Sequence, residues 1–124
     1  MNEFQTVYQA IGEEKIKELT RYFYEGVESN EALRSIYPED LAPAEERLYL
    51  FLLQVFGGPT TYSEERGHPR LRMRHLQWAI DDKMRNHWLN NMLNALDRIE
   101  VDQNVKELMM GYFVKVANHM INRQ

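Results

Sequence analysis

The spacing of apolar residues predicts helices along most of this chain. Ile16, Leu19, Phe23 and Val27 recur three or four positions apart, which places them on one buried face of a helix. No segment alternates apolar and polar residues with a period of two, and β-branched residues are sparse. We therefore expect an all-α fold, built from layered helices that cross at an angle rather than from a parallel bundle.

Glycine and proline mark the ends of the predicted helices in the first half of the chain. A short helix is expected at residues 6–10, and the turn at 12–14 starts a longer helix with acidic residues at its positive end. A single turn at 33–36 ends before Pro38, because the residue preceding a proline is kept out of the helical region. The next helix starts at Pro43 and ends before a glycine pair. Its apolar face comprises Leu41, Ala44, Leu48, Phe51, Leu52 and Val55.

The second half is predicted to contain an irregular loop, a short helix and two longer helices. Residues 60–67 lack an apolar period, so we expect a loop of the kind that often binds a ligand. A short helix at 69–75 follows, with proline at its first position. Asp81 and Asp102 are the expected N-caps of the two final helices. Their apolar stripes are Met84, Trp88, Met92, Ala95 and Ile99 in the first, and Val105, Leu108, Tyr112, Val116 and Met120 in the second.

Length and composition indicate one folded domain. A chain of 124 residues builds one core, and a hydrophobic share of 44% with seven Tyr and five Phe is typical of a globular protein. The net charge of -4 supplies no basic field, so nucleic acid is not an expected partner. No apolar stretch approaches the roughly 20 residues that span a bilayer, and the N-terminus lacks a secretory pattern. We therefore expect a cytoplasmic protein without a membrane span.

The absence of cysteine restricts the chemistry that the chain can perform. With no Cys, disulfides, thiolate metal sites, iron–sulfur clusters and cysteine nucleophiles are all excluded. The acidic residues occur largely as adjacent pairs, whose side chains diverge by about 100° on a helix and do not form a metal clamp. Neither Gly-x-Ser-x-Gly nor a phosphate-binding loop is present, so the sequence gives no sign of a hydrolase.

Among the four histidines, His75 has the setting that best favours metal ligation. It ends the short basic helix, with Arg72 and Arg74 nearby to pair with acidic groups on a ligand. One imidazole commonly holds haem iron while its other nitrogen donates a hydrogen bond, here to the carbonyl of Leu71 if the segment is helical. A single histidine is more often an ordinary surface or core residue. Its position alone therefore leaves both interpretations open.

A series of short motifs in a fixed order gives His75 a more specific meaning. In chain order they are Tyr37-Pro38-Glu39-Asp40, Ala44-Glu45-Glu46-Arg47-Leu48, Phe51-Leu52, Gly57-Gly58-Pro59, Thr61-Tyr62-Ser63-Glu64 and Gly67-His68-Pro69-Arg70-Leu71-Arg72-Met73-Arg74-His75. The series extends upstream to Phe23-Tyr24 and downstream to Trp88-Leu89 and Ala117-Asn118-His119-Met120. It resembles the group II, or O-type, truncated haemoglobins over nearly the whole chain.

This resemblance implies a truncated globin, a two-over-two helical sandwich around haem b, as a single domain over residues 1–124. His75 matches the proximal ligand of the iron. Arg47 and Tyr62 match positions that contact haem propionates. Phe51, with its apolar side chain, and Arg74, with its positive charge, are also expected to bind the haem. The positions that match the distal pocket are Tyr24, Tyr37, Ala44, Leu48 and Trp88.

The position that could gate the distal pocket carries Ala44 instead of a histidine. Hydrogen bonds to iron-bound dioxygen must then come from Tyr24, Tyr37 or the indole N–H of Trp88. With ~1 kcal/mol from each donor, we expect slow release of dioxygen.

The function implied by the resemblance is the binding of dioxygen and other diatomics such as nitric oxide or carbon monoxide, by a monomer or homodimer. A role in oxygen transport, storage, sensing or detoxification is left open, and a reductase is a candidate partner. The alternative is a haem-dependent redox enzyme, a peroxidase or nitric oxide dioxygenase. Peroxidase activity is expected to be secondary, because no distal His or Arg is indicated for moving the peroxide proton. A helical interaction module without cofactor and a non-haem metal enzyme are the other classes considered.

Overall fold

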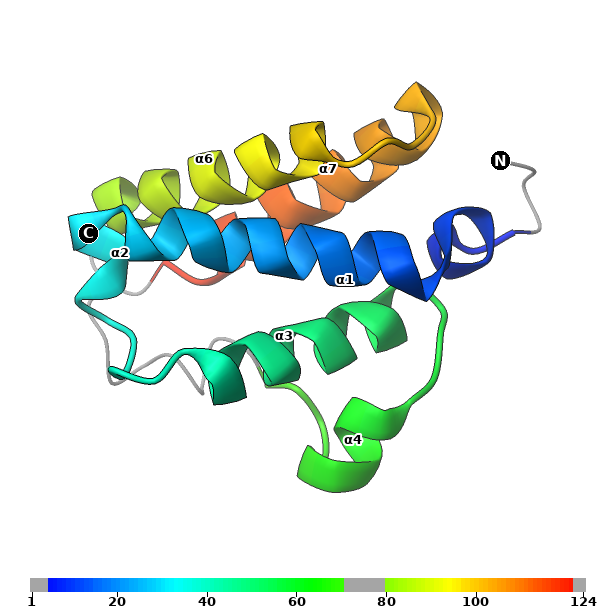
Figure 1. The fold of residues 1–124 in the computed structure, drawn as a ribbon, viewed down its shortest axis with the longest axis horizontal. Coiled ribbons are helices and arrows are strands. Elements are labelled where there is room, and N and C mark those ends of the chain that lie inside the picture. The colour runs from blue at the N-terminus through cyan, green and yellow to red at the C-terminus, as the bar shows by residue number, and fades with distance from the viewer. Residues whose placement is uncertain (1–4, 71–79, 122–124) are drawn as a thin grey trace.

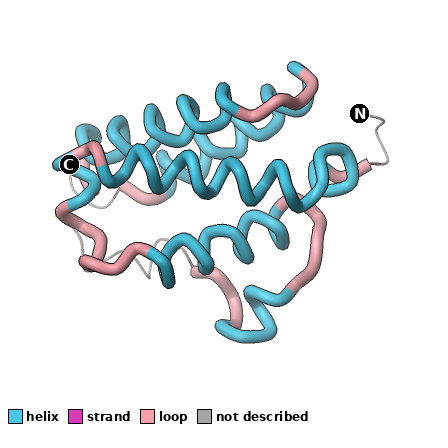
Figure 2. The backbone as a smooth tube through the Cα atoms, in the orientation of Figure 1, coloured by secondary structure: helices cyan, strands magenta, loops and turns pink. Residues whose placement is uncertain are grey.

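The computed structural model describes residues 5–70 and 80–121, and within these residues the chain forms helices joined by loops (Figure 2). This confirms the prediction of an all-α fold. None of the described helices combines the length and apolar character needed to cross a membrane. The helices are α1 (Val7–Glu28), α2 (Glu31–Arg34), α3 (Ala42–Val55), α4 (Thr61–Arg66), α6 (Asp82–Arg98) and α7 (Gln103–His119).

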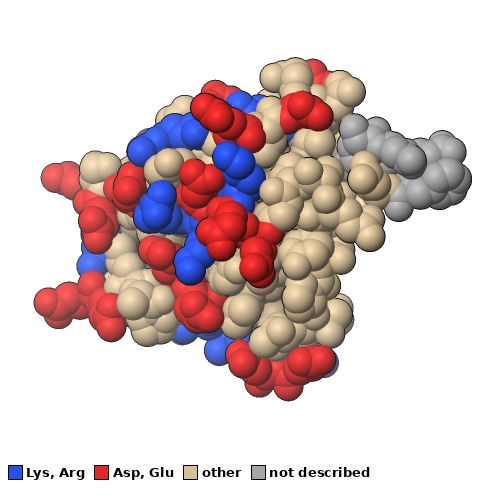
Figure 3. Space-filling view, turned by 45° about the vertical axis from the view of Figure 1, so that its right-hand side comes forward, with Lys and Arg blue, Asp and Glu red and all other residues tan. Residues whose placement is uncertain are grey.

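Four of these helices form two layers. Helix α1 packs against α3 on one side and against α6 on the other, and α7 packs against α6 (Figure 1). The pair α1 and α3 therefore lies over the pair α6 and α7, the expected two-over-two arrangement. The face in Figure 3 carries Lys and Arg interleaved with Asp and Glu, so no field of a single sign covers it.

The turn predicted at residues 12–14 is a kink at Gly12 within helix α1. Gly12 has φ +81 and ψ 167, a conformation that a residue with a side chain adopts only with strain. Before the kink, Thr6 and Gln9 form a capping box that satisfies the first backbone N–H groups. After it, the predicted stripe is fully buried. The stripe comprises Ile16, Leu19, Phe23 and Val27.

Helix α4 corrects the prediction of an irregular loop at residues 60–67. The Gln54 side chain of α3 donates to Ser63 Oγ at 2.7 Å and accepts from the Ser63 backbone N–H at 3.0 Å. Tyr62 is buried with its ring centroid 5.5 Å from that of Phe51. These contacts with α3 stabilise a helix of six residues. Tyr62 is its one buried residue, so the segment shows no helical repeat of apolar positions in the sequence.

The helix predicted at 69–75 does not begin where expected. Pro69 and Arg70 are not helical, and Arg70 has φ +46, outside the helical region. Residues 71–75 lie outside the described residues, so that part of the prediction stays untested.

The last two helices begin near the predicted residues, but the face of α7 differs from the prediction. The Asp81 side chain caps α6 by accepting from Met84 N–H at 2.9 Å, whereas the Asp102 side chain makes no capping hydrogen bond. Leu108 was expected in the buried stripe of α7 and is 52% exposed. The core is filled instead by Met109 and Phe113, because apolar residues occur on more than one face of this helix.

Candidate functional site

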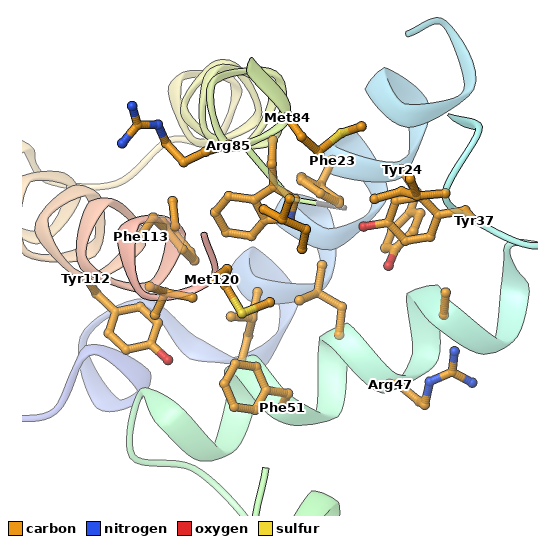
Figure 4. A pocket seen from close by; sticks show the side chains of 18 of the residues that line it. Phe23, Tyr24, Tyr37, Arg47, Phe51, Met84, Arg85, Tyr112, Phe113 and Met120 are labelled. Carbon is orange, nitrogen blue, oxygen red and sulfur yellow. The ribbon is translucent and has the colours of Figure 1, made fainter. Parts of the chain in front are cut away.

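A cavity of about 540 Å³ lies between the two helix layers (Figure 4). Aromatic and aliphatic side chains from α1, α3, α6 and α7 make up most of its described lining, together with Tyr62 of α4 and the loop after α2. Cofactor and ligand sites typically have volumes of about 300–1,000 Å³ and a mostly apolar lining with a few polar groups. The cavity is therefore the candidate site of this protein.

All the predicted site residues that the structure describes line this one cavity. They are Tyr24, Tyr37, Ala44, Arg47, Leu48, Phe51, Tyr62 and Trp88. Arg74 and His75 lie outside the described residues, so the structure leaves their position untested.

Tyr24, Tyr37 and Trp88 meet at one end of the cavity. Tyr24 comes from α1 and is 5% exposed, Tyr37 comes from the loop after α2, and Trp88 comes from α6. The ring centroids of Tyr24 and Tyr37 are 5.6 Å apart in an edge-to-face contact, and Figure 4 shows the two rings side by side. Side-chain hydrogen bonds join Tyr37 to both Tyr24 and Trp88.

Burial and these hydrogen bonds both affect the ionisation of the two tyrosines. Burial raises the pKa of Tyr37 to about 12, although the hydrogen bonds to Tyr24 and Trp88 act in the opposite direction. Burial also raises the pKa of Tyr24, and its hydrogen bond to Tyr37 adds to that effect. The indole N–H of Trp88 can only donate, so the Tyr37 oxygen accepts that bond, whereas either hydroxyl can donate in the bond between Tyr24 and Tyr37.

The opposite end of the cavity is formed by residues that the sequence did not predict as site residues. Tyr112 and Val116 of α7 and Met120 at its C-terminal cap recur every four residues and line the cavity, as does Met84 of α6. Burial raises the pKa of Tyr112 to about 12. These three residues belong to the apolar stripe that the sequence predicts for this helix. A stripe that faces a cavity has the same spacing as one that faces the core, so the sequence did not distinguish the two.

Arginine supplies the positive charge of the described lining. Arg47 was predicted, whereas Arg66 and Arg85 were not. The guanidinium of Arg66 lies 6.0 Å from the centroid of the Tyr62 ring, and that of Arg85 donates to the side-chain oxygen of Asn118. Such cations can pair with carboxylates of a ligand. Among the described residues, His, Cys, Asp and Glu form no cluster of three or more that could hold a metal ion.

Comparison with known proteins identifies a sequence family. Residues 6–122 match the family described as bacterial-like globin. The chain is 39% identical over 120 residues to the group 2 truncated hemoglobin YjbI of Bacillus subtilis, an alignment that covers 97% of this chain and 91% of that protein.

Solved structures give the same result for the fold. A thermostable hemoglobin from the actinobacterium Thermobifida fusca is 48% identical with a TM-score of 0.92, covering 95% of this chain and 98% of that one. A truncated oxygen-avid haemoglobin from Bacillus subtilis is 39% identical with a TM-score of 0.91, covering 95% and 100%. The chain therefore belongs to the group II truncated haemoglobins, bacterial-like globins whose cofactor is haem b.

Proposed function

We propose that this haemoprotein binds dioxygen at an iron held by His75, with Tyr37 as the principal hydrogen-bond donor to the bound ligand. Binding of diatomic ligands at haem is a property of its family. The identity of the ligand and the roles of individual residues are the additional steps of the proposal. It is supported by the oxygen-avid character of the similar Bacillus subtilis protein.

The described residues fit haem b. Haem is a flat apolar body with two carboxylates at one edge, and the cavity offers apolar walls with arginines in its lining. Leu48, Phe51 and Met84 would contact the porphyrin, and Arg47 with Tyr62 would hold the carboxylates. Haem supplies an iron that takes a diatomic ligand, and the chain determines how firmly that ligand is held.

The single observation that carries the proposal is the hydrogen-bond arrangement around Tyr37. Its oxygen accepts from the Trp88 indole, and Tyr37 also bonds Tyr24; with Tyr24 as the donor, the hydroxyl hydrogen of Tyr37 would bond a ligand in the cavity. A dioxygen ligand in the cavity would carry partial negative charge and would accept such a bond from Tyr37. Ala44 and Leu48, which also line this region, have no side-chain donor. Tyr37 is then the donor, while Tyr24 and Trp88 fix its orientation.

Redox turnover of peroxide remains a secondary alternative. A general acid–base group would be needed to move the peroxide proton, and the described lining contains no His, Asp or Glu. Tyr24 and Tyr37 are poor substitutes, because their raised pKa values keep both phenols neutral near pH 7.

Absorption spectra of His75→Ala test the role of the proximal histidine. The unmodified protein should show an intense Soret band with one haem per chain, and His75→Ala should lose most of it. Added imidazole should restore the band by replacing the missing ligand. His119→Ala is the matched control, because His119 is exposed at the end of α7 and outside the cavity lining. An unchanged spectrum in His75→Ala would refute this assignment.

A further inference from the structure

One arginine on helix α2 holds the loop that carries Tyr37. Nη1 of Arg34 donates to the carbonyl of Pro38 at 2.8 Å and to that of Tyr37 at 3.3 Å, and Nη2 donates to the carbonyl of Glu39 at 2.6 Å. Three successive carbonyls thus converge on a single guanidinium. The guanidinium is planar, permanently charged and presents its donors in a fixed fork, so the three bonds together define the path of the loop.

Helix α2, which carries Arg34, is fixed by a buried leucine and by a contact with α6. Leu33 is fully buried, and its backbone N–H donates to the Asn30 side-chain oxygen at 3.1 Å. The Asn30 amide nitrogen lies 3.2 Å from Nδ1 of His87, the residue that precedes Trp88 on α6. The helix that carries Arg34 is therefore attached to the helix that carries the indole donor.

The loop has few other means of keeping its shape. Pro38 has no backbone N–H, and the backbone N–H of Tyr37 bonds back to the carbonyl of Arg34 itself at 3.2 Å. The Asp40 side chain accepts from Ala42 N–H at 3.1 Å, which belongs to the start of α3 rather than to the turn at Tyr37. Loss of the guanidinium would leave three carbonyls without these charge-assisted bonds and would release the backbone on both sides of the tyrosine.

We propose that Arg34 is a positioning residue for ligand binding, which it influences by fixing the hydroxyl of Tyr37 where Tyr24 and Trp88 reach it. Arg34 is not part of the cavity lining, so it acts through Tyr37 rather than on the ligand. This inference rests on the proposed donor role of Tyr37. It adds that the strength of the donor depends on a side chain outside the pocket.

Dioxygen dissociation from the reduced holoprotein measures this effect. Arg34→Gln should release dioxygen ~tenfold faster, as expected for the loss of hydrogen bonds to a charged group. Arg34→Lys keeps the charge without the fork and should lie between Arg34→Gln and the unmodified protein, and it serves if the glutamine variant fails to fold. Arg98→Gln is the control, because Arg98 is exposed and bonds Glu25 at 2.9 Å on the outer surface. Its rate should stay within about twofold of the original.

A double-mutant cycle separates positioning from general destabilisation. In a Tyr37→Phe background, Arg34→Gln should change the dissociation rate by less than about twofold, because the group that it positions is gone. The same tenfold factor in both backgrounds would show that Arg34 acts only through overall structure, and the inference would be overturned.

The indole N–H resonance of Trp88, assigned by Trp88→Phe, provides a second readout in the carbon monoxide form. In Arg34→Gln it should shift toward its position in Tyr37→Phe, because the indole donates to the Tyr37 oxygen. An unmoved resonance with an unchanged dissociation rate overturns the inference and leaves the proposed function intact. If Tyr37→Phe itself leaves dissociation unchanged, the donor role of Tyr37 fails and the inference fails with it.

Discussion

Two tyrosines at opposite ends of the cavity reach the same raised pKa in different surroundings. Burial raises the pKa of Tyr112 to about 12, whereas Tyr37 reaches about 12 although two hydrogen bonds lower it. Figure 4 shows Tyr37 beside Tyr24 on one side of the pocket and Tyr112 across from them. The comparison indicates that one end of the cavity is built for directional hydrogen bonding and the other chiefly for apolar contact. Predictions that compare the two ends can test this difference.

The largest expected difference is in the dissociation of dioxygen from Tyr37→Phe and Tyr112→Phe. Tyr37→Phe removes the proposed donor to the ligand and the oxygen that bonds Tyr24 and Trp88, a loss of ~2 kcal/mol or roughly thirtyfold in rate. Tyr112→Phe should stay within about twofold, because Tyr112 lies at the other end. Stopped-flow measurement on both variants decides the point, and equal effects would contradict the proposed difference between the ends.

Alanine substitutions at two helical glycines should change the stability of the protein in opposite directions. A Cβ at Gly26 would lie 1.7 Å from Oδ1 of Asn91, whose amide nitrogen donates to the Phe23 carbonyl at 2.8 Å. Gly26→Ala should displace Asn91 and lower the free energy of unfolding by about 1–3 kcal/mol. A Cβ at Gly111 meets nothing within 4 Å, so Gly111→Ala should raise it by about 0.5–1 kcal/mol through helix propensity.

Urea unfolding of the two holoprotein variants measures both changes. A Gly26→Ala variant as stable as the unmodified protein would show that α1 and α6 do not approach closely at Gly26.

Trp88→Phe should have an intermediate effect on dissociation. The Trp88 ring packs against both Phe23 and Phe113, with centroid distances of 5.7 Å and 6.2 Å. Phenylalanine keeps much of this packing but loses the N–H bond to Tyr37, which is worth ~1 kcal/mol or about fivefold in rate. Dissociation kinetics of Trp88→Phe compared with Tyr37→Phe test this order. A larger effect in Trp88→Phe would indicate that the indole bonds the ligand directly.

The smallest expected effect is the pH dependence of unfolding in alkaline solution. The pKa of Tyr37 and of Tyr112 is about 12 in the folded protein, compared with 10.0 for an ordinary tyrosine. The unfolded chain therefore loses these protons first, and the corresponding stabilisation, complete below pH 10, decreases between pH 10 and pH 12. Tyr37→Phe and Tyr112→Phe should each make this decrease shallower in urea titrations near pH 9 and pH 11. Identical pH profiles in all three proteins would exclude the shifts.

The sequence predicted those parts of the fold that depend on local chemistry. The turn at Gly12 and the cap at Asp81 follow from residues within one turn of the feature, and the structure confirms both. Helix α4 is stabilised by hydrogen bonds between its Ser63 and Gln54 of α3. A contact between two helices does not appear in the spacing of apolar residues, so the sequence did not predict it. Leu108 was misplaced because α7 has apolar residues on its outer side as well as toward the core and the cavity.

The candidate site was predictable where residues match a family pattern. Tyr24, Tyr37 and Trp88 were selected through the resemblance, since a tyrosine or tryptophan at helical spacing is otherwise ordinary core. Tyr112 was assigned to the core because a cavity has no signature in the sequence. Arg34 could not be found at all, because its acceptors are backbone carbonyls whose convergence depends on the path of the loop.

The cavity also links the cellular abundance of this protein to the supply of its cofactor. A ligand that binds only the folded chain stabilises it by an amount that grows with ligand concentration, about 4 kcal/mol at a thousandfold excess over the dissociation constant. Side chains lining a space of about 540 Å³ depend on that ligand for many of their contacts. When haem is scarce, a larger fraction of the polypeptide is open to proteases, since degradation tracks the population of unfolded chains. We therefore expect less of the protein to persist when haem is scarce.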